Sequence, residues 1–137
     1  MRFVAFNLKK VSGERYLNDF SDLNVGTSIN LNSVEENKAS QPRPGTIYLD
    51  VFFTYIIDYS KKVAKVELDG KVVLSVDEKI GKEILKNWKG KDLKDEIRVE
   101  IFNGILMKSN LKALQIEEDL GLPPHFKMPS LSIPKKE

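Results

Sequence analysis

The chain has 137 residues, of which 41% are hydrophobic and 31% charged, and its formal net charge is +2. This composition indicates one folded domain rather than a disordered segment, and the near-neutral charge gives no general attraction to nucleic acid. The absence of cysteine and the single histidine, His125, exclude disulfides, cysteine nucleophiles and multi-histidine metal sites within one chain. No apolar run reaches the roughly 20 residues of a membrane helix, and Lys9-Lys10 comes too early for a signal peptide. We therefore expect a cytoplasmic protein that does not insert into a membrane.

The first half of the chain predicts four strands. Residues 3–11 predict a strand, with Phe3, Val4, Ala5, Phe6, Leu8 and Val11 as its apolar residues. Residues 27–35 alternate around Ile29 and Leu31 and fall out of phase at Ser33-Val34, which indicates a bulge. Residues 46–58 and 63–76 form two longer runs with the same period of two.

Residues 46–58 are unusual because both faces of the predicted strand are apolar. We expect the side chains of one row to be buried in the core or in an oligomer interface: Ile47, Leu49, Val51, Phe53, Tyr55 and Ile57. The opposite row contains Tyr48, Phe52 and Ile56, which could be covered in the same way or remain free to bind. This excess of apolar side chains predicts self-association.

The apolar period changes to that of helices after Val76. One helix is expected from Glu78 to about Trp88, capped by Asp77, with a stripe formed by Ile80, Ile84, Leu85 and Trp88. A longer helix is expected from about Asp92 to Leu120, ended by Gly121, and Asn103-Gly104 within it indicates either a break or a close contact. Strands followed by helices predict a single α+β domain, 1–137, with an antiparallel four-stranded sheet, two helices on one face and an extended tail over 121–137.

Several apolar side chains outside the expected core are candidates for binding other polypeptides. Tyr16, Phe20 and Leu23 lie in the connection after the first strand, where they could wall a groove or pack locally. On the long helix, the stripe of Met107, Leu111 and Leu114 could be core or a surface that accepts varied partners. In the tail, Phe126 and Met128 could line a groove or tie the tail down.

Polar residues give little sign of catalysis. We expect Glu117-Glu118 to be solvated surface, because neighbours on a helix do not point to one site, and we expect His125 to be a satisfied or exposed histidine. No phosphate-binding glycine loop and no nucleophile–base pair is visible. The sequence therefore predicts a protein that is not an enzyme, with no catalytic residues, no metal and no cofactor.

Three stretches, in the right order, resemble the SecB family of export chaperones. They are Thr27-Ser28-Ile29-Asn30-Leu31-Asn32, the strand over 63–77 that passes through Gly70, and the helix end Leu120-Gly121-Leu122-Pro123-Pro124 with its extended continuation. The resemblance covers roughly residues 3–131 at low identity and rests on the order of the elements and the Leu-Pro-Pro ending.

This resemblance implies an ATP-independent chaperone that holds unfolded polypeptides as a homotetramer, a dimer of dimers, for export or targeting. The family's zinc-binding tail, which docks on the SecA motor, has no counterpart in Lys135-Lys136-Glu137. The delivery partner therefore stays open, and a SecB-like chaperone that serves a toxin–antitoxin pair would also fit. Two alternatives remain: a subunit dedicated to one fixed partner, and a small-ligand pocket or enzyme in an α+β cup.

Overall fold

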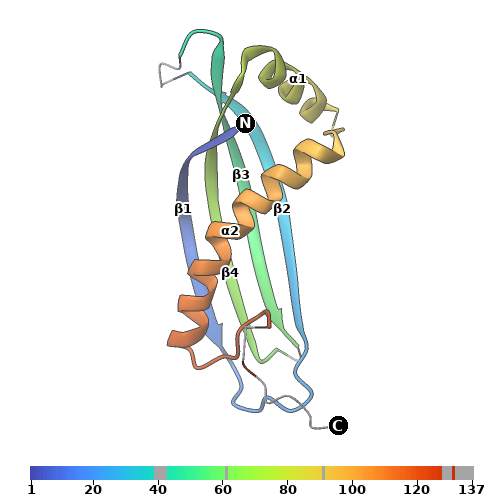
Figure 1. Cartoon of the computed structure of the whole chain (residues 1–137). Coiled ribbons are helices and arrows are strands. Elements are labelled where there is room, and N and C mark those ends of the chain that lie inside the picture. The colour runs from blue at the N-terminus through green and yellow to red at the C-terminus, as the bar shows by residue number, and fades with distance from the viewer. Residues whose placement is uncertain (39–42, 61, 91, 128–130, 132–137) are drawn as a thin grey trace, which may run out of the picture.

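The computed structural model describes residues 1–38, 43–60, 62–90, 92–127 and 131. Four strands are followed by two helices, in the order β1 (Arg2–Arg15), β2 (Val25–Asn37), β3 (Thr46–Tyr59), β4 (Ala64–Asp77), α1 (Glu78–Lys89) and α2 (Asp95–Asp119). The strands form one antiparallel sheet in the order β1-β4-β3-β2, and both helices lie across the same face of it (Figure 1). The predicted α+β fold is confirmed.

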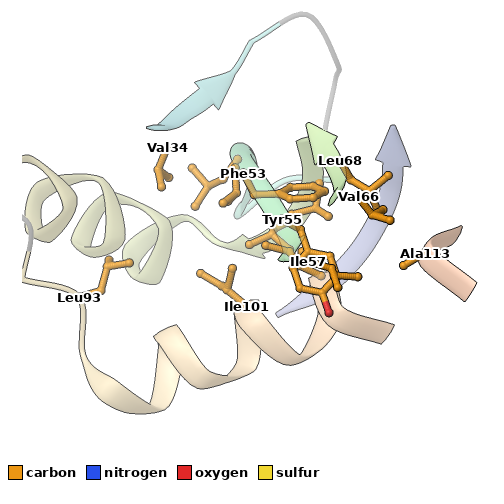
Figure 2. Packing of buried hydrophobic residues seen from close by; sticks show 14 of the residues in the cluster. Val34, Phe53, Tyr55, Ile57, Val66, Leu68, Leu93, Ile101 and Ala113 are labelled. Atoms are coloured by element: carbon orange, nitrogen blue, oxygen red, sulfur yellow. The ribbon is translucent and has the colours of Figure 1, made fainter. Parts of the chain in front are cut away.

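The buried row of β3 forms the centre of the core. Leu49, Val51, Phe53, Tyr55 and Ile57 are all buried on the helix-covered face, as the sequence predicts, whereas Ile47 at the start of the row is half-buried. Their neighbours across the β3–β4 ladder, among them Val66 and Leu68, are buried as well. Figure 2 shows this row between the sheet and the helices, which contribute Ile101 and Ala113.

The strand boundaries differ from the sequence prediction mainly at β1. This strand continues past Val11 to Arg15, because Ser12 to Arg15 pair with β4, so the connection to β2 shortens to residues 16–24. The bulge predicted in β2 is present as a register shift between Leu31 and Ser33. A second shift, in β1 between Leu8 and Lys10, lies opposite Gly70, where the β1 backbone approaches so closely that a side chain would collide with it.

Helix α1 packs through a glycine rather than through its whole apolar stripe. A side chain at Gly81 would collide with Ile47 and Val76, so the glycine permits a close approach to the sheet, and Ile84 is fully buried beside it. Ile80, predicted to belong to the stripe, is 41% exposed, and that prediction is wrong because the contact face is centred on Gly81. Asp77 stands at the predicted N-cap but makes no side-chain capping bond.

Helix α2 buries a row with a spacing of four: Ile101, Ile105, Ser109, Ala113 and Glu117. Of the second apolar stripe, which could be core or surface, Met107 and Leu111 are strongly exposed and Leu114 is half-buried. Glu117 is only 1% exposed, so the prediction of solvated surface is wrong for this residue, although Glu118 is exposed. The helix is unbroken at Asn103-Gly104, where Gly104 lies against the ring of Phe3.

Helix α2 ends as predicted at Gly121, which has a positive φ of 67°. The amide of Gly121 donates to the Glu118 carbonyl, and the amide of Leu122 donates to the Glu117 carbonyl, which is the Schellman pattern. The turn directs the following residues back over the sheet (Figure 1). Neither helix in the described part of the chain is long and apolar enough to cross a membrane.

Candidate functional site

The structure places the candidate binding residues on three separate surfaces rather than in one site. One is a groove between β1 and α2, one is a hollow at the turn end of the sheet, and one is the sheet face that the helices leave open. All three expose apolar side chains.

The first surface, the β1–α2 groove, has a volume of about 650 Å³. Phe3, Val4 and Phe6 of β1 form one wall, and Asn103, Gly104 and Met107 of α2 form the other. Met107 is 70% exposed and Val4 48% exposed, although both side chains are apolar. The groove exists because Gly104 brings α2 against Phe3 while Met107, one turn later, projects beyond the contact. Lys108 lies at its edge and supplies a positive charge.

The second surface, the turn-end hollow, lies at the opposite end of β1 and has a volume of about 760 Å³. Tyr16 and Leu17 form its exposed apolar wall, and Tyr16 is 54% exposed. Their backbone amides both donate to the carbonyl of Val63, at 2.7 and 3.2 Å, which fixes the connection against the β3–β4 turn. Charged side chains surround the hollow: Asp58, Lys62 and Lys65.

The third surface is the open face of the sheet. Tyr48, Phe52 and Ile56 are half-buried there, opposite the row of β3 that forms the core. Their cross-strand neighbours on β4 are Ser75, Lys71 and Glu67, so apolar and charged side chains alternate across the face. Lys71 pairs with Asp50 at 3.5 Å on the same face. This surface is a mixed one and not a continuous apolar patch.

Of the remaining candidate residues, some pack against the core and others are exposed to solvent. Phe20 and Leu23 pack against the core, and the guanidinium of Arg15 lies 4.6 Å from the centre of the Phe20 ring, so local packing describes them better than a groove wall. Leu111 is exposed on α2, one turn beyond Met107. Phe126 is partly exposed and contacts the ring of His125. Met128 lies outside the described residues.

A buried polar network lies beneath the chain that follows α2. Nδ1 of His125 is 2.5 Å from Oε1 of Glu117, and Nε2 of His125 is 2.8 Å from Oδ1 of Asn110. The phenol of Tyr55 donates to the same Asn110 oxygen at 2.7 Å. Burial, and then the charge of Glu117, raise the pKa of Tyr55 to about 12, so the phenol remains a donor at neutral pH. The prediction that His125 is a satisfied histidine agrees with these contacts.

This network has the form of a structural clamp. It brings together a carboxyl group, an imidazole, an amide and a phenol, and in the part of the chain that the structure describes no serine, threonine or lysine is hydrogen-bonded to the imidazole as a nucleophile would be. Among the described residues, no group of three or more histidine, aspartate or glutamate side chains is placed to hold a metal ion.

Sequence reasoning missed the β1 side of the groove. Phe3, Val4 and Phe6 belong to the apolar run of the predicted first strand, to which the sequence pattern assigns no binding role. The register shift between Phe3 and Ala5 changes the phase of the strand at Val4, and the single visible signal for a contact there was Asn103-Gly104.

Comparison with solved structures finds the same arrangement of elements elsewhere. A SecB-like chaperone of Mycobacterium tuberculosis, Rv1957, solved in complex with a ChAD peptide from the HigA1 antitoxin Rv1956, matches over 98% of this chain and 92% of its own, with a TM-score of 0.50 and 13% identity. The fold is SecB-like. At this identity the likeness concerns the fold alone, and it agrees with the resemblance seen in the sequence. No family model matches the chain, and no curated protein matches it.

Proposed function

We propose that this SecB-like chain is an ATP-independent chaperone that holds non-native polypeptides. The observation that carries the proposal is the β1–α2 groove, in which Val4 and Met107 remain exposed beside the half-covered Phe3. Methionine suits such a surface, because its flexible, polarisable side chain adapts to different partners. A groove with apolar walls and a charged edge fits an extended polypeptide that exposes apolar side chains.

The energetics of holding favour several weak sites acting together. Burying one large apolar side chain contributes about 1.5–3 kcal/mol, and ordering a flexible client removes much of that gain. One groove of about 650 Å³ accommodates only a few side chains, so useful affinity requires several grooves on one assembly. We therefore include in the proposal a homotetramer, arranged as a dimer of dimers. Light scattering tests this assembly, and a stable monomer at micromolar concentration would contradict it.

The groove is tested by Met107→Gln, with Ile80→Gln as the matched control. Both substitutions place a similar polar side chain at an exposed apolar position on a helix, but Ile80 lies on α1, outside the groove. The measurement is suppression of aggregation for a panel of unrelated unfolded proteins. Met107→Gln should reduce suppression across the panel by several-fold, and Ile80→Gln should not. Equal loss of aggregation suppression in the two variants would show that the groove does not hold clients.

A second candidate function is that of a chaperone dedicated to one partner. It is favoured by the similar Mycobacterium tuberculosis protein, which was solved with a peptide from an antitoxin. The same panel separates the two functions. A general chaperone suppresses aggregation of many clients, whereas a dedicated one suppresses aggregation of a single partner and leaves the others unaffected.

A further inference from the structure

The chain that follows α2 covers part of the same sheet face as the helices, over the Tyr55 and Tyr59 end of β3. We call residues 122–126 the strap. Leu122 is buried in the core, and the phenol of Tyr59 donates to the carbonyl of Pro123 at 2.5 Å. The ring of His125 meets that of Tyr55 edge-on, with 6.3 Å between centroids. Figure 1 shows this segment, in red, lying beside α2 over the lower part of the sheet. The strap therefore fills a trough whose floor is β3 and whose wall is α2.

The wall of this trough contains a buried glutamate that the strap contacts. Both oxygens of Glu117 lie within hydrogen-bonding distance of His125, Oε1 from the ring at 2.5 Å and Oε2 from the backbone amide at 3.4 Å. His125 is the one basic side chain paired with Glu117 among the described residues. The other titratable groups facing the carboxyl group are the phenols of Tyr55 and Tyr59, which remain neutral because burial and Glu117 raise the pKa of each. Without the strap, Glu117 would lose both of its contacts with His125.

The histidine ring is held at both of its nitrogens. Nδ1 faces the carboxyl group of Glu117, and Nε2 faces the side-chain amide of Asn110. Because the two ring nitrogens point in different directions, one imidazole meets both partners at once. The trough thus selects an apolar chain that also delivers one imidazole side chain to Glu117. This requirement belongs to the trough and is the same whichever chain occupies it.

The strap itself is held at its hinge and at its centre. Nη1 of Arg15 donates to the carbonyl of Leu120 at 2.8 Å, next to the left-handed Gly121. The centre is fixed by Tyr59 and Glu117, while Phe126 at the far end is partly exposed. Two prolines keep the segment extended, so it resembles an unfolded client already docked.

We propose that the trough beneath residues 122–126 is a second polypeptide-binding site, which accepts an extended apolar client segment bearing one histidine when the strap moves aside. The inference rests on the proposed function and adds a client preference to it. Because the strap is tethered, its effective concentration is in the millimolar range, so it blocks weak clients and yields to those that also occupy other grooves.

The test uses the full-length chain carrying His125→Ala, which weakens the strap and leaves Glu117 unpaired. The probes are two fluorescein-labelled peptides, Gly-Leu-Pro-Pro-His-Phe-Lys, which has the sequence of residues 121–127, and the same peptide with alanine in place of histidine. Fluorescence anisotropy measures their Kd. The variant should bind the histidine peptide at least about tenfold more tightly than the alanine peptide, because the contacts of the ring with Glu117 and Asn110 are lost in the second complex. The parent chain should bind both weakly.

Two further variants complete the experiment. Adding Glu117→Leu to His125→Ala should abolish the preference for histidine while retaining apolar binding. If His125→Ala does not fold, Phe126→Ala replaces it, since this side chain is partly exposed and its removal weakens the strap from outside. Equal affinity for the two peptides, or no binding by the folded variants, would overturn the inference. The proposed function is judged separately, because aggregation suppression by the parent chain does not depend on which peptide the trough prefers.

Discussion

The ring of Phe3 lies directly against Gly104, so that the first strand and the longer helix touch where the helix has no side chain. A Cβ at position 104 would overlap the ring, and Phe3 is itself partly exposed at the edge of the β1–α2 groove. The same contact therefore sets the distance between the two elements and the width of the groove.

Gly104→Ala should destabilise the protein despite the better helix propensity of alanine. The propensity gain is about 1 kcal/mol, whereas a methyl group that displaces the Phe3 ring from its contact costs about 1–3 kcal/mol. Urea unfolding measures the difference. Gly26→Ala is the control, because no atom lies within 4 Å of its added Cβ. Combining Gly104→Ala with Phe3→Ala should recover part of the loss, and a lack of any recovery would show that the ring is not the obstacle.

Glu117→Gln and Glu118→Gln make adjacent, chemically identical changes with different expected outcomes. Glu117 is buried and paired with His125, so weakening this pair should lower the free energy of unfolding by about 1–3 kcal/mol. Glu118 is exposed, and its change should stay within about 0.5 kcal/mol. Chemical denaturation of the two variants in parallel gives the comparison. Similar losses for both would contradict the buried pair.

Phe52→Ala and Phe53→Ala test the two faces of β3. Phe53 is 1% exposed and stacks on Phe6 with 5.6 Å between ring centroids, so its truncation should cost about 3–5 kcal/mol. Phe52 is half-buried on the open face, and its truncation should leave the fold and the oligomer intact while weakening client holding. Denaturation, light scattering and the aggregation assay are read on the same samples. Loss of the oligomer in Phe52→Ala would place this ring in a subunit interface instead.

The buried phenols predict how stability changes in alkali. The pKa of Tyr55 is raised to about 12 from an ordinary value of 10, first by burial and then by Glu117. The folded state therefore holds the proton more tightly than the unfolded state, and stability present below pH 10 should fall as pH rises toward 12. Urea midpoints between pH 9 and 12 measure this fall. Tyr55→Phe should make it shallower, and an unchanged slope would exclude Tyr55 as a cause.

The fold was predictable because apolar side chains recur at every second residue in the long strands β3 and β4 and about every 3.6 residues in α1. In addition, Gly90 and Gly121 mark the ends of the two helices. Helix α2 was harder to interpret, since apolar side chains surround it and its buried row includes Ser109 and Glu117. Which row faces the sheet is decided by where Gly104 can approach Phe3, and that contact joins residues about 100 positions apart in sequence.

The candidate site was predictable only in part, for a similar reason. Met107 and Tyr16 stood out as apolar side chains in excess of the core, and both line hollows. Val4 did not, because it continues an ordinary strand pattern in the sequence, and the register shift that places it at the rim is visible in the structure alone. The pairing of Glu117 with His125 depends on the turn at Gly121, which reverses the chain between them. The sequence predicts the turn at Gly121, but it does not predict that the turn places His125 against Glu117.

The strand order has a consequence for how the protein is made. Strands β2, β3 and β4 are joined as successive hairpins, whereas β1 pairs only with β4. Arg2 pairs with Ser75, so this pair cannot form until residue 75 has been synthesised. During synthesis, the apolar N-terminal strand leaves the ribosome first and finds its partner only after most of the sheet has been translated. Closing that long loop is the slow step that the topology imposes. Until it closes, the nascent chain is exposed to the same aggregation hazard as an unfolded client.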